Sequence, residues 1–235
     1  ARLPLAQALH HTSHRSAFQK RLIQQPLMKN VLADLAVETE SALTLGLRTA
    51  KAVDAAGRDE HETAMARILT PIAKYWNCKR APYAVFEALE CHGGPGYVEE
   101  APLARMYREA PLNSIWEGPG NVQCLDVLRV LAREPDAIEA LFAELNAARG
   151  ADSRLDTAID EIRTELDAPD GLEARMRGVT ELMALTLQGA LLTQHGDAGV
   201  AEAFCASRLG PRWRGAFGAL PGGAKLDALL ERALP

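Results

Sequence analysis

The sequence shows neither a long apolar run nor the pattern of a signal peptide. No stretch of its 235 residues approaches the roughly 18 consecutive apolar side chains of a transmembrane helix. The N-terminus lacks the positively charged segment and apolar run of a signal peptide. We therefore expect a cytoplasmic protein with no membrane partner.

Paired cysteines are also missing. The four cysteines are Cys78, Cys91, Cys124 and Cys205, and none forms the C-x-x-C spacing that would place two thiolates on one metal ion. We predict that they are reduced thiols in the core and that the chain holds no metal.

An excess of positive charge is absent as well. The net charge is −5, and residues 133–235 hold 11 basic side chains against 17 acidic ones. A surface that binds duplex DNA must neutralise several phosphates, so this segment would repel DNA on average. We predict weak, non-specific DNA binding at most, and a submicromolar, steeply salt-dependent dissociation constant would overturn that prediction.

One local exception is the basic segment around Trp213. Arg208, Arg212 and Arg214 flank this aromatic side chain and could contact backbone phosphates. Alternatively, the segment is a basic turn that Trp213 anchors in the core and that acids such as Glu202 oppose.

The strict alternation of apolar and polar residues that marks a strand is not found either. Apolar positions instead keep helical spacing through the first 57 residues, and Gly57 ends that pattern. A long helix is expected over 60–91, where Pro71 and Pro82 should bend or break it. The fold class is therefore all α, built from packed antiparallel helices.

Further helices are expected along the rest of the chain. A short helix should cover 102–109, and a helix over 122–132 should bury Val122, Leu125, Leu128 and Leu131. Beyond Arg133 the helical spacing continues, and a Gly/Pro-rich tail over 210–223 precedes a last short helix ending near Leu234. We divide the chain into a helical bundle at 1–132 and a helical extension at 133–235.

Glu117 is the first candidate for chemistry. It follows a large aromatic, Trp116, and precedes Gly118, Pro119 and Gly120, which break one helix and open the next. A carboxylate in such a turn can remove a proton from carbon if it is desolvated and rigidly aimed. The alternative is a helix-capping acid that only accepts backbone N–H bonds.

Two further segments could contact a ligand. Gly93 and Gly94 lie in a loop that lets backbone approach a flat or phosphorylated group, although an ordinary helix–helix turn has the same composition. Arg15 can bind phosphate bidentately, and Phe18 can pack on a ring system. A solvated arginine beside a core phenylalanine is the alternative.

Taken in order, the three segments resemble the C-terminal domain of acyl-CoA dehydrogenases. They are RSAFQKRLI at 15–23, LECHGGPGY at 89–97 and IWEG at 115–118. The segments QPLM at 25–28, YRE at 107–109, NSIWEG at 113–118 and CLDVLRVL at 124–131 are most similar to the alkylation-response branch of that family. The helical extension after Arg133 is also similar to that branch.

The resemblance implies a four-helix bundle that takes part in binding FAD. It implies that Arg15 reaches the FAD pyrophosphate of a neighbouring subunit, that Phe18 packs near the cofactor, and that Gly93 and Gly94 contribute backbone contacts. Glu117 matches the base that abstracts the α-proton of an acyl-CoA.

Several residues depart from the family pattern. Pro119 replaces a threonine, Asn121 replaces a longer glutamine at a cofactor-binding position, Gln19 replaces a glycine, and Glu90 replaces a glutamine. Glu90 would bring negative charge toward a phosphate, so these changes weaken the expected adenine and pyrophosphate contacts.

The resemblance also implies missing parts. The family builds its pocket from an N-terminal helical domain, a middle β domain and this bundle. The sequence opens on ARLPL at 1–5, a helical pattern with no capping residue before it, so we expect the chain to begin inside a domain. We expect an acyl-CoA substrate, a dimer or tetramer, and little or no activity from this chain alone. The alternatives are a stress-response scaffold that binds DNA or protein, and a helical oligomerisation domain.

Overall fold

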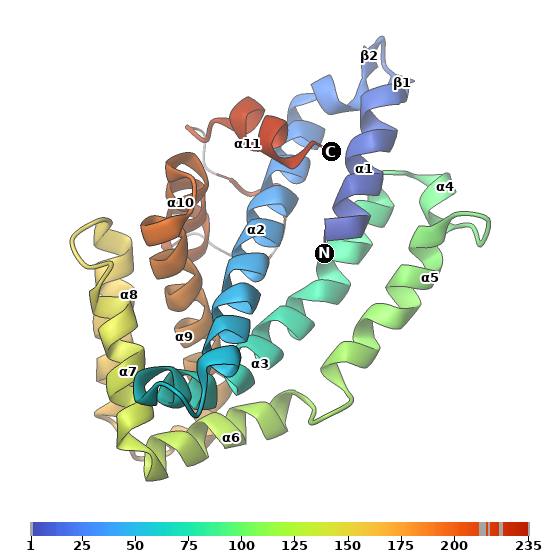
Figure 1. Ribbon diagram of the computed structural model, residues 1–235. Helices are drawn as coiled ribbons and strands as arrows, with labels where there is room; N and C mark the ends of the chain where they lie inside the picture. Colours follow the sequence, from blue (N-terminus) through green and yellow to red (C-terminus); the bar gives the residue numbers. More distant parts are fainter. Residues whose placement is uncertain (1, 212–214, 216, 221–222, 235) are drawn as a thin grey trace.

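The computed structural model describes residues 2–211, 215, 217–220 and 223–234, and it is almost entirely helical (Figure 1). The helices of the first segment are α1 (Arg2–His14), α2 (Pro26–Ala55), α3 (Glu60–Glu90), α4 (Gly94–Tyr97), α5 (Pro102–Glu109) and α6 (Gly120–Arg133). A 3₁₀ turn, η2 (Ala110–Ser114), joins the last two. The all-α prediction is confirmed.

A short hairpin interrupts the predicted helical pattern of the first 57 residues. Strands β1 (Ser16–Ala17) and β2 (Lys20–Arg21) pair antiparallel, and the 3₁₀ turn η1 (Leu22–Gln24) leads into α2. Each strand has two residues, so neither is long enough to leave an alternating pattern in the sequence.

Helices α2 and α3 form the antiparallel centre of the molecule. Their facing side chains, among them Leu45, Ile68 and Ile72, are fully buried, and each such side chain contributes about 1.5–3 kcal/mol by leaving water. We expected Pro71 and Pro82 to bend or break this helix. Helix α3 runs through both prolines without ending, so it is not broken there. Burial along this helix outweighs the cost of the missing N–H groups.

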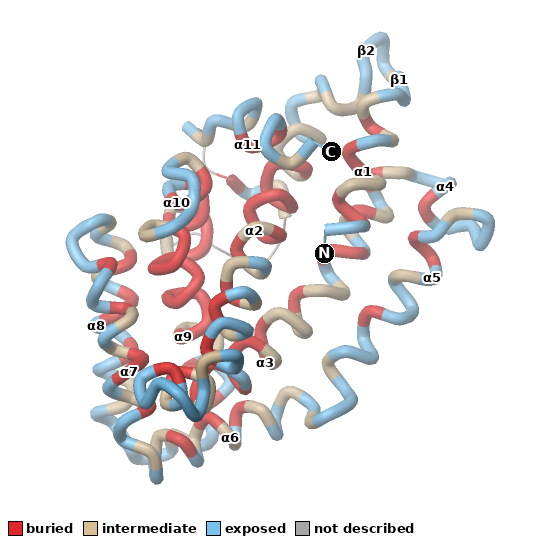
Figure 2. The backbone as a smooth tube through the Cα atoms, in the orientation of Figure 1, coloured by how far each residue is buried: buried red, intermediate tan, exposed pale blue. Residues whose placement is uncertain are grey.

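The predicted extension forms helices that share one core with the bundle. They are α7 (Pro135–Asn146), α8 (Ser153–Leu166), α9 (Leu172–His195), α10 (Ala198–Phe204), the π-helical turn η3 (Cys205–Leu209) and α11 (Leu226–Ala233). Helix α9 packs against α2, α3 and α6. Buried residues gather along α2, α3 and α9, whereas the hairpin is exposed (Figure 2).

The buried face of α6 differs from the prediction. Cys124, Val127 and Val130 are buried, whereas Val122 and Leu125 are 49% and 43% exposed. Helix α6 has apolar residues around most of its circumference, and its contacts with α3 and α9 decide which of them enter the core.

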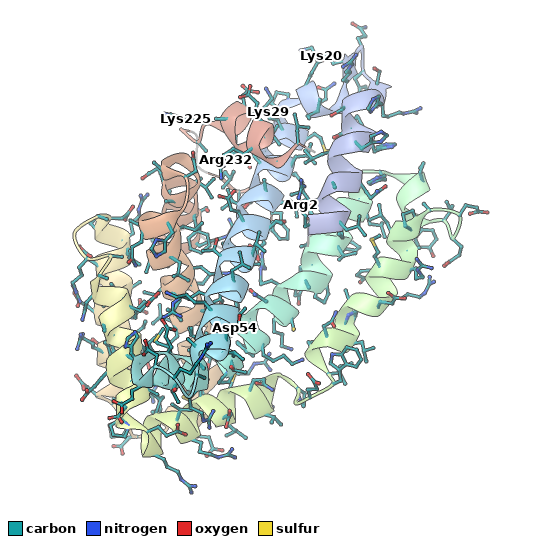
Figure 3. The ribbon with its side chains drawn as sticks, viewed as in Figure 1. Arg2, Lys20, Lys29, Asp54, Lys225 and Arg232 are labelled. Carbon is teal, nitrogen blue, oxygen red and sulfur yellow. The ribbon has the colours of Figure 1, made fainter. Side chains whose placement is uncertain are left out.

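Polar contacts fix α11 across α2, and Figure 3 labels three of the side chains that make them, Arg2, Lys29 and Arg232. Lys29 Nζ lies 2.6 Å from Asp227 Oδ1, and Arg232 Nη2 lies 2.7 Å from Glu40 Oε1. Arg2 Nη1 donates to the carbonyl of Ala233 over 3.0 Å, so the two ends of the described chain meet.

The cysteines are unpaired thiols, as predicted, and three of the four are buried. Burial raises the pKa of Cys91 and of Cys205 to about 12, which leaves both thiols protonated and unreactive. Among the described helices, none is long and apolar enough to cross a membrane.

Candidate functional site

Arg15 and Phe18 lie on the exposed hairpin that follows α1. Phe18 and Gln19 form its two-residue turn with φ of 52° and 67°, a left-handed pair that non-glycine residues rarely adopt. Phe18 is 91% exposed, so the core reading of this side chain is not supported. Arg15 is exposed beside it at the end of α1.

Gly93 and Gly94 form an open turn at the end of α3. Gly93 adopts a φ of 64° and precedes α4, and a Cβ added at either glycine would meet no atom within 4 Å. The space beside the turn is therefore available to a flat or phosphorylated group. Gly96 differs, because an added Cβ would lie 2.3 Å from the carbonyl oxygen of Leu89.

A pair of histidines that sequence reasoning missed brings these two segments together. The rings of His11 on α1 and His92 at the end of α3 stack, with centroids 4.6 Å apart and planes 27° apart. His11 lies one helical turn before Arg15, and His92 immediately precedes Gly93. A histidine beside each motif was the available signal, but only the fold reveals that the two rings touch.

Glu117 occupies a strained turn between η2 and α6. Its φ is 55°, that of Gly118 is 101°, and Gln123 Nε2 donates to the carbonyls of both residues over 3.0 and 3.2 Å. Pro119 is the N-cap residue of α6, without a side-chain capping bond, so the structure does not support the helix-capping reading of Glu117. Its carboxylate is exposed beside the half-exposed Trp116.

Asn121 lies in the first turn of α6, on the same side of the molecule as Glu117. Arg177 of α9 approaches its Oδ1 at 3.5 Å and donates to the Tyr75 hydroxyl at 3.4 Å. Helix α5 and η2 separate this region from the glycine turn (Figure 1). The structure thus joins the segments of Arg15 and of Gly93 and Gly94 through the His11–His92 stack, and it places Glu117 and Asn121 in a second group.

The surroundings of Glu117 are apolar and open. Exposed apolar side chains on α5, on η2, in the turn that follows η2 and on α6, which we call the Trp116 surface, are Tyr107, Leu112, Ile115, Trp116, Val122 and Leu125. A cavity of about 1060 Å³ lies elsewhere, between the α2–α3 turn and the start of α7, and none of the predicted site residues lines it. In the described part of the chain, no cluster of three His, Cys, Asp or Glu side chains could hold a metal ion.

The basic segment near Trp213 is described only in part. Arg208 is buried, and its Nη2 lies 2.5 Å from Asp34 Oδ1 and 3.1 Å from Glu38 Oε2. A guanidinium held between two buried carboxylates is not available to a nucleic-acid phosphate. Arg212 and Arg214 lie outside the described residues.

The structure defines an all-helical bundle, and comparison with known proteins identifies its family. Residues 1–132 match the family model of the acyl-CoA dehydrogenase C-terminal domain. The chain belongs to the acyl-CoA dehydrogenase family.

Among known relatives, AidB of Escherichia coli K12 is 37% identical over 227 residues, which are 97% of this chain and 40% of that protein. Acyl-CoA dehydrogenase family member 11 of Caenorhabditis elegans is 29% identical over 218 residues, covering 83% of this chain and 35% of that protein. The chain therefore spans well under half the length of these relatives.

Solved structures share the fold. ACDH-11 of Caenorhabditis elegans, determined in complex with C11-CoA, superposes with a TM-score of 0.79 at 26% identity over 92% of this chain and 42% of that one. An acyl-CoA dehydrogenase of Bacillus anthracis complexed with FAD gives a TM-score of 0.65 at 17% identity, covering 99% of this chain and 46% of that one.

Proposed function

We propose that this chain is the C-terminal part of an FAD-dependent acyl-CoA dehydrogenase of the alkylation-response branch. The observation that carries the proposal is the position of Glu117, a carboxylate held in a left-handed turn beside exposed apolar side chains. Backbone strain of this kind costs about 1–3 kcal/mol and persists where function requires a fixed geometry. The 37% identity to AidB over nearly the whole chain supports the branch.

In the proposed reaction Glu117 is the base. Its carboxylate takes the α-proton of the acyl-CoA, the β-carbon loses a hydride, and the two carbons form a double bond. Bound FAD supplies the hydride acceptor. An exposed carboxylate is a weak base, so the other domains of the longer protein must cover Glu117, and this chain alone should be almost inactive.

The residues around the glycine turn fit a dinucleotide. Gly93 and Gly94 leave open space where a side chain would otherwise project, and the exposed Arg15 can donate two parallel hydrogen bonds to a phosphate. Phe18 protrudes from the hairpin and is available to pack on a group outside its own chain. We propose Asn121 as a further cofactor contact, in the first turn of α6 near Glu117.

This arrangement favours a homo-oligomer. Arg15 and Phe18 project from one end of the chain, whereas Glu117 lies beyond α5. In the proposed assembly Arg15 and Phe18 of one subunit contact the cofactor of its neighbour.

The test of the base uses the complete reading frame that encodes this chain, purified with FAD. Glu117→Gln should lower the rate at which acyl-CoA bleaches the flavin by at least about 100-fold, the usual contribution of a positioned base. Glu100→Gln, which changes another exposed glutamate between α4 and α5, should leave the rate of flavin bleaching unchanged. A folded, FAD-loaded parent protein that no acyl-CoA bleaches would overturn the proposed activity.

The cofactor contacts are tested separately by FAD retention in the same protein. Arg15→Gln should weaken FAD binding by roughly tenfold or more, because a hydrogen bond between charged groups contributes about 1.5–3 kcal/mol. Arg21→Gln removes a neighbouring charge from the same hairpin and should have a smaller effect. Equal losses in the two variants would indicate a general charge effect in place of a specific contact.

A further inference from the structure

The His11–His92 stack joins the two segments that we propose to bind the nucleotide. The backbone N–H of Arg15 donates to the carbonyl of His11 over 2.8 Å, so Arg15 is tied to the residue that carries the stacked ring. His92 Nδ1 lies 2.8 Å from the carbonyl of Ala88, and its backbone N–H donates to the carbonyl of Leu89. The ring of His92 is therefore fixed to the last turn of α3.

The contact with Ala88 fixes the tautomer of His92. A carbonyl oxygen only accepts, so Nδ1 carries the hydrogen in this contact, and Nε2 of the neutral ring carries none. Protonation of His11 places a full positive charge within a stack whose centroids are 4.6 Å apart. Two imidazolium rings at that distance repel each other, whereas two neutral rings attract.

The groups facing the stack oppose protonation. Burial lowers the pKa of His11 below 6.5, and His92, Arg15 and His10 lower it further. The carbonyl ends of α1 and α3 favour a cation, and Glu90 in the last turn of α3 adds negative charge, but these do not reverse the direction. A second pair, His10 and His14 with rings 4.5 Å apart, adds two more titratable groups on α1.

We propose that the His11–His92 stack positions Arg15 against the Gly93–Gly94 turn for a nucleotide phosphate, and that protonation opens it. This inference rests on the proposed function, since it assigns two positioning residues to the same cofactor site. The ligand class is a pyrophosphate-bridged dinucleotide. Acidification below neutral pH releases the turn, and with it the cofactor.

The direction of the pH effect follows from the lowered pKa of His11. The folded chain holds this proton less tightly than the unfolded chain, whose histidine titrates near the ordinary 6.5. The stability that the neutral stack gives to the folded turn is fully present above pH 6.5, and it is lost as the pH falls through the lowered pKa of His11. We therefore expect the turn to loosen on the acid side.

Hydrogen exchange of this chain without cofactor tests the stack. The reporters are the N–H groups of Gly93 and Gly96, which donate to the carbonyls of Glu90 and Gly93. His92→Ala should speed their exchange about fivefold at neutral pH, the factor expected for one aromatic pair. His61→Ala, an exposed histidine in the first turn of α3, is the control and should change nothing.

A double variant separates the charge from the stacking. His11→Phe with His92→Phe keeps two aromatic rings but leaves neither ring able to take up a proton. The N–H groups of Gly93 and Gly96 should then stay protected from exchange from neutral pH down to about pH 5, which is below the usual histidine pKa. The parent chain should lose protection over the same interval. Identical pH profiles, or no effect of His92→Ala, would overturn the proposal.

FAD affinity of the complete reading frame then connects the stack to the cofactor. The parent should bind FAD several times more weakly on the acid side, and the double phenylalanine variant should not. If FAD does not bind at all, the proposed function fails while the exchange result still decides the stack. If FAD binds with an affinity that is the same in the parent and in His92→Ala, the inference fails and the proposed function stands.

Discussion

A buried charge cluster shows how single residues hold the extension to the bundle. Arg208 of η3 contacts Asp34 and Glu38 of α2, and Arg80 Nε of α3 lies 2.6 Å from Glu38 Oε1. Burial alone would raise the pKa of Glu38, but Arg208 and Arg80 outweigh it and hold the pKa below its usual range. Asp34 also accepts the N–H groups of Gly218 and Ala219. Two guanidiniums therefore balance two buried carboxylates, and that of Arg208 contacts both of them.

Removing that guanidinium should be costly. Arg208→Met leaves Asp34 and Glu38 underpaired in the interior and should lower the free energy of unfolding by about 3–5 kcal/mol, measured by urea denaturation at neutral pH. Arg129→Met breaks an exposed pair with Asp126 and should cost less than about 0.5 kcal/mol. The contribution of Glu38 is present above its unfolded pKa of about 4.5 and disappears as the pH falls below it. If Arg208→Met lowered the free energy of unfolding by no more than Arg129→Met, the proposed role of Arg208 in balancing the buried carboxylates would be contradicted.

The strained turn at Glu117 allows a test of a single glycine. A Cβ on Gly118, at a φ of 101°, would lie 2.6 Å from Gln123 Nε2, whose bonds close the turn. Gly118→Ala should therefore destabilise the chain by about 1–3 kcal/mol in thermal unfolding. The matched change Gly178→Ala, in the middle of α9 where an added Cβ meets no atom within 4 Å, should stabilise by about 0.5–1 kcal/mol. Effects of the same sign would show that the turn is not strained.

At the scale of elements, α11 depends on its buried leucines. Leu230 is buried against the core, whereas Leu234 just beyond the helix is exposed. Leu230→Ala should lower the unfolding free energy by about 2–4 kcal/mol through lost burial and the cavity left behind. Leu234→Ala should have little effect in the same denaturation experiment. If neither Leu230→Ala nor Leu234→Ala changes the free energy of unfolding, α11 does not unfold cooperatively with the core.

Sequence patterns predicted elements best where local chemistry decides them. Helix α5 begins at Pro102, a residue that fits the first turn of a helix, and its predicted bounds match the structure. The buried face of α6 was wrong because its apolar residues surround most of the helix, so tertiary contacts choose among them. The hairpin was missed because Phe18 and Gln19 are not the usual residues of a two-residue turn.

The site was predictable only as separate motifs. Composition marked the Gly93–Gly94 turn and the Glu117 turn, since glycine and proline report local backbone geometry. Nothing in the spacing indicated that Arg15 meets the glycine turn through two histidines, or that α5 holds Glu117 away from both. Such relations arise from packing between distant segments, which local patterns do not encode.

At the scale of the whole molecule, the chain leaves six large apolar side chains exposed on α5, η2, α6 and the turn before α6. The Trp116 surface includes Ile115 and Trp116, which are 60% and 53% exposed, close in sequence to the proposed base. Soluble monomers rarely leave large apolar patches without a partner. Relatives that match this chain extend well beyond it, so we expect the Trp116 surface to be covered in the complete protein.

The isolated chain should therefore self-associate through this surface. Sedimentation velocity should show a concentration-dependent rise in mass, and Val122→Gln with Leu125→Gln should reduce it, because both side chains are exposed and their loss spares the core. The matched pair Leu43→Gln with Leu47→Gln alters exposed leucines on α2, away from Glu117, and should leave association unchanged. A monomer at high concentration, or equal effects of the two pairs, would show that the Trp116 surface does not drive assembly. Association that only the substitutions on α6 suppress would identify the Trp116 surface, next to the proposed base Glu117, as the surface through which the chain associates.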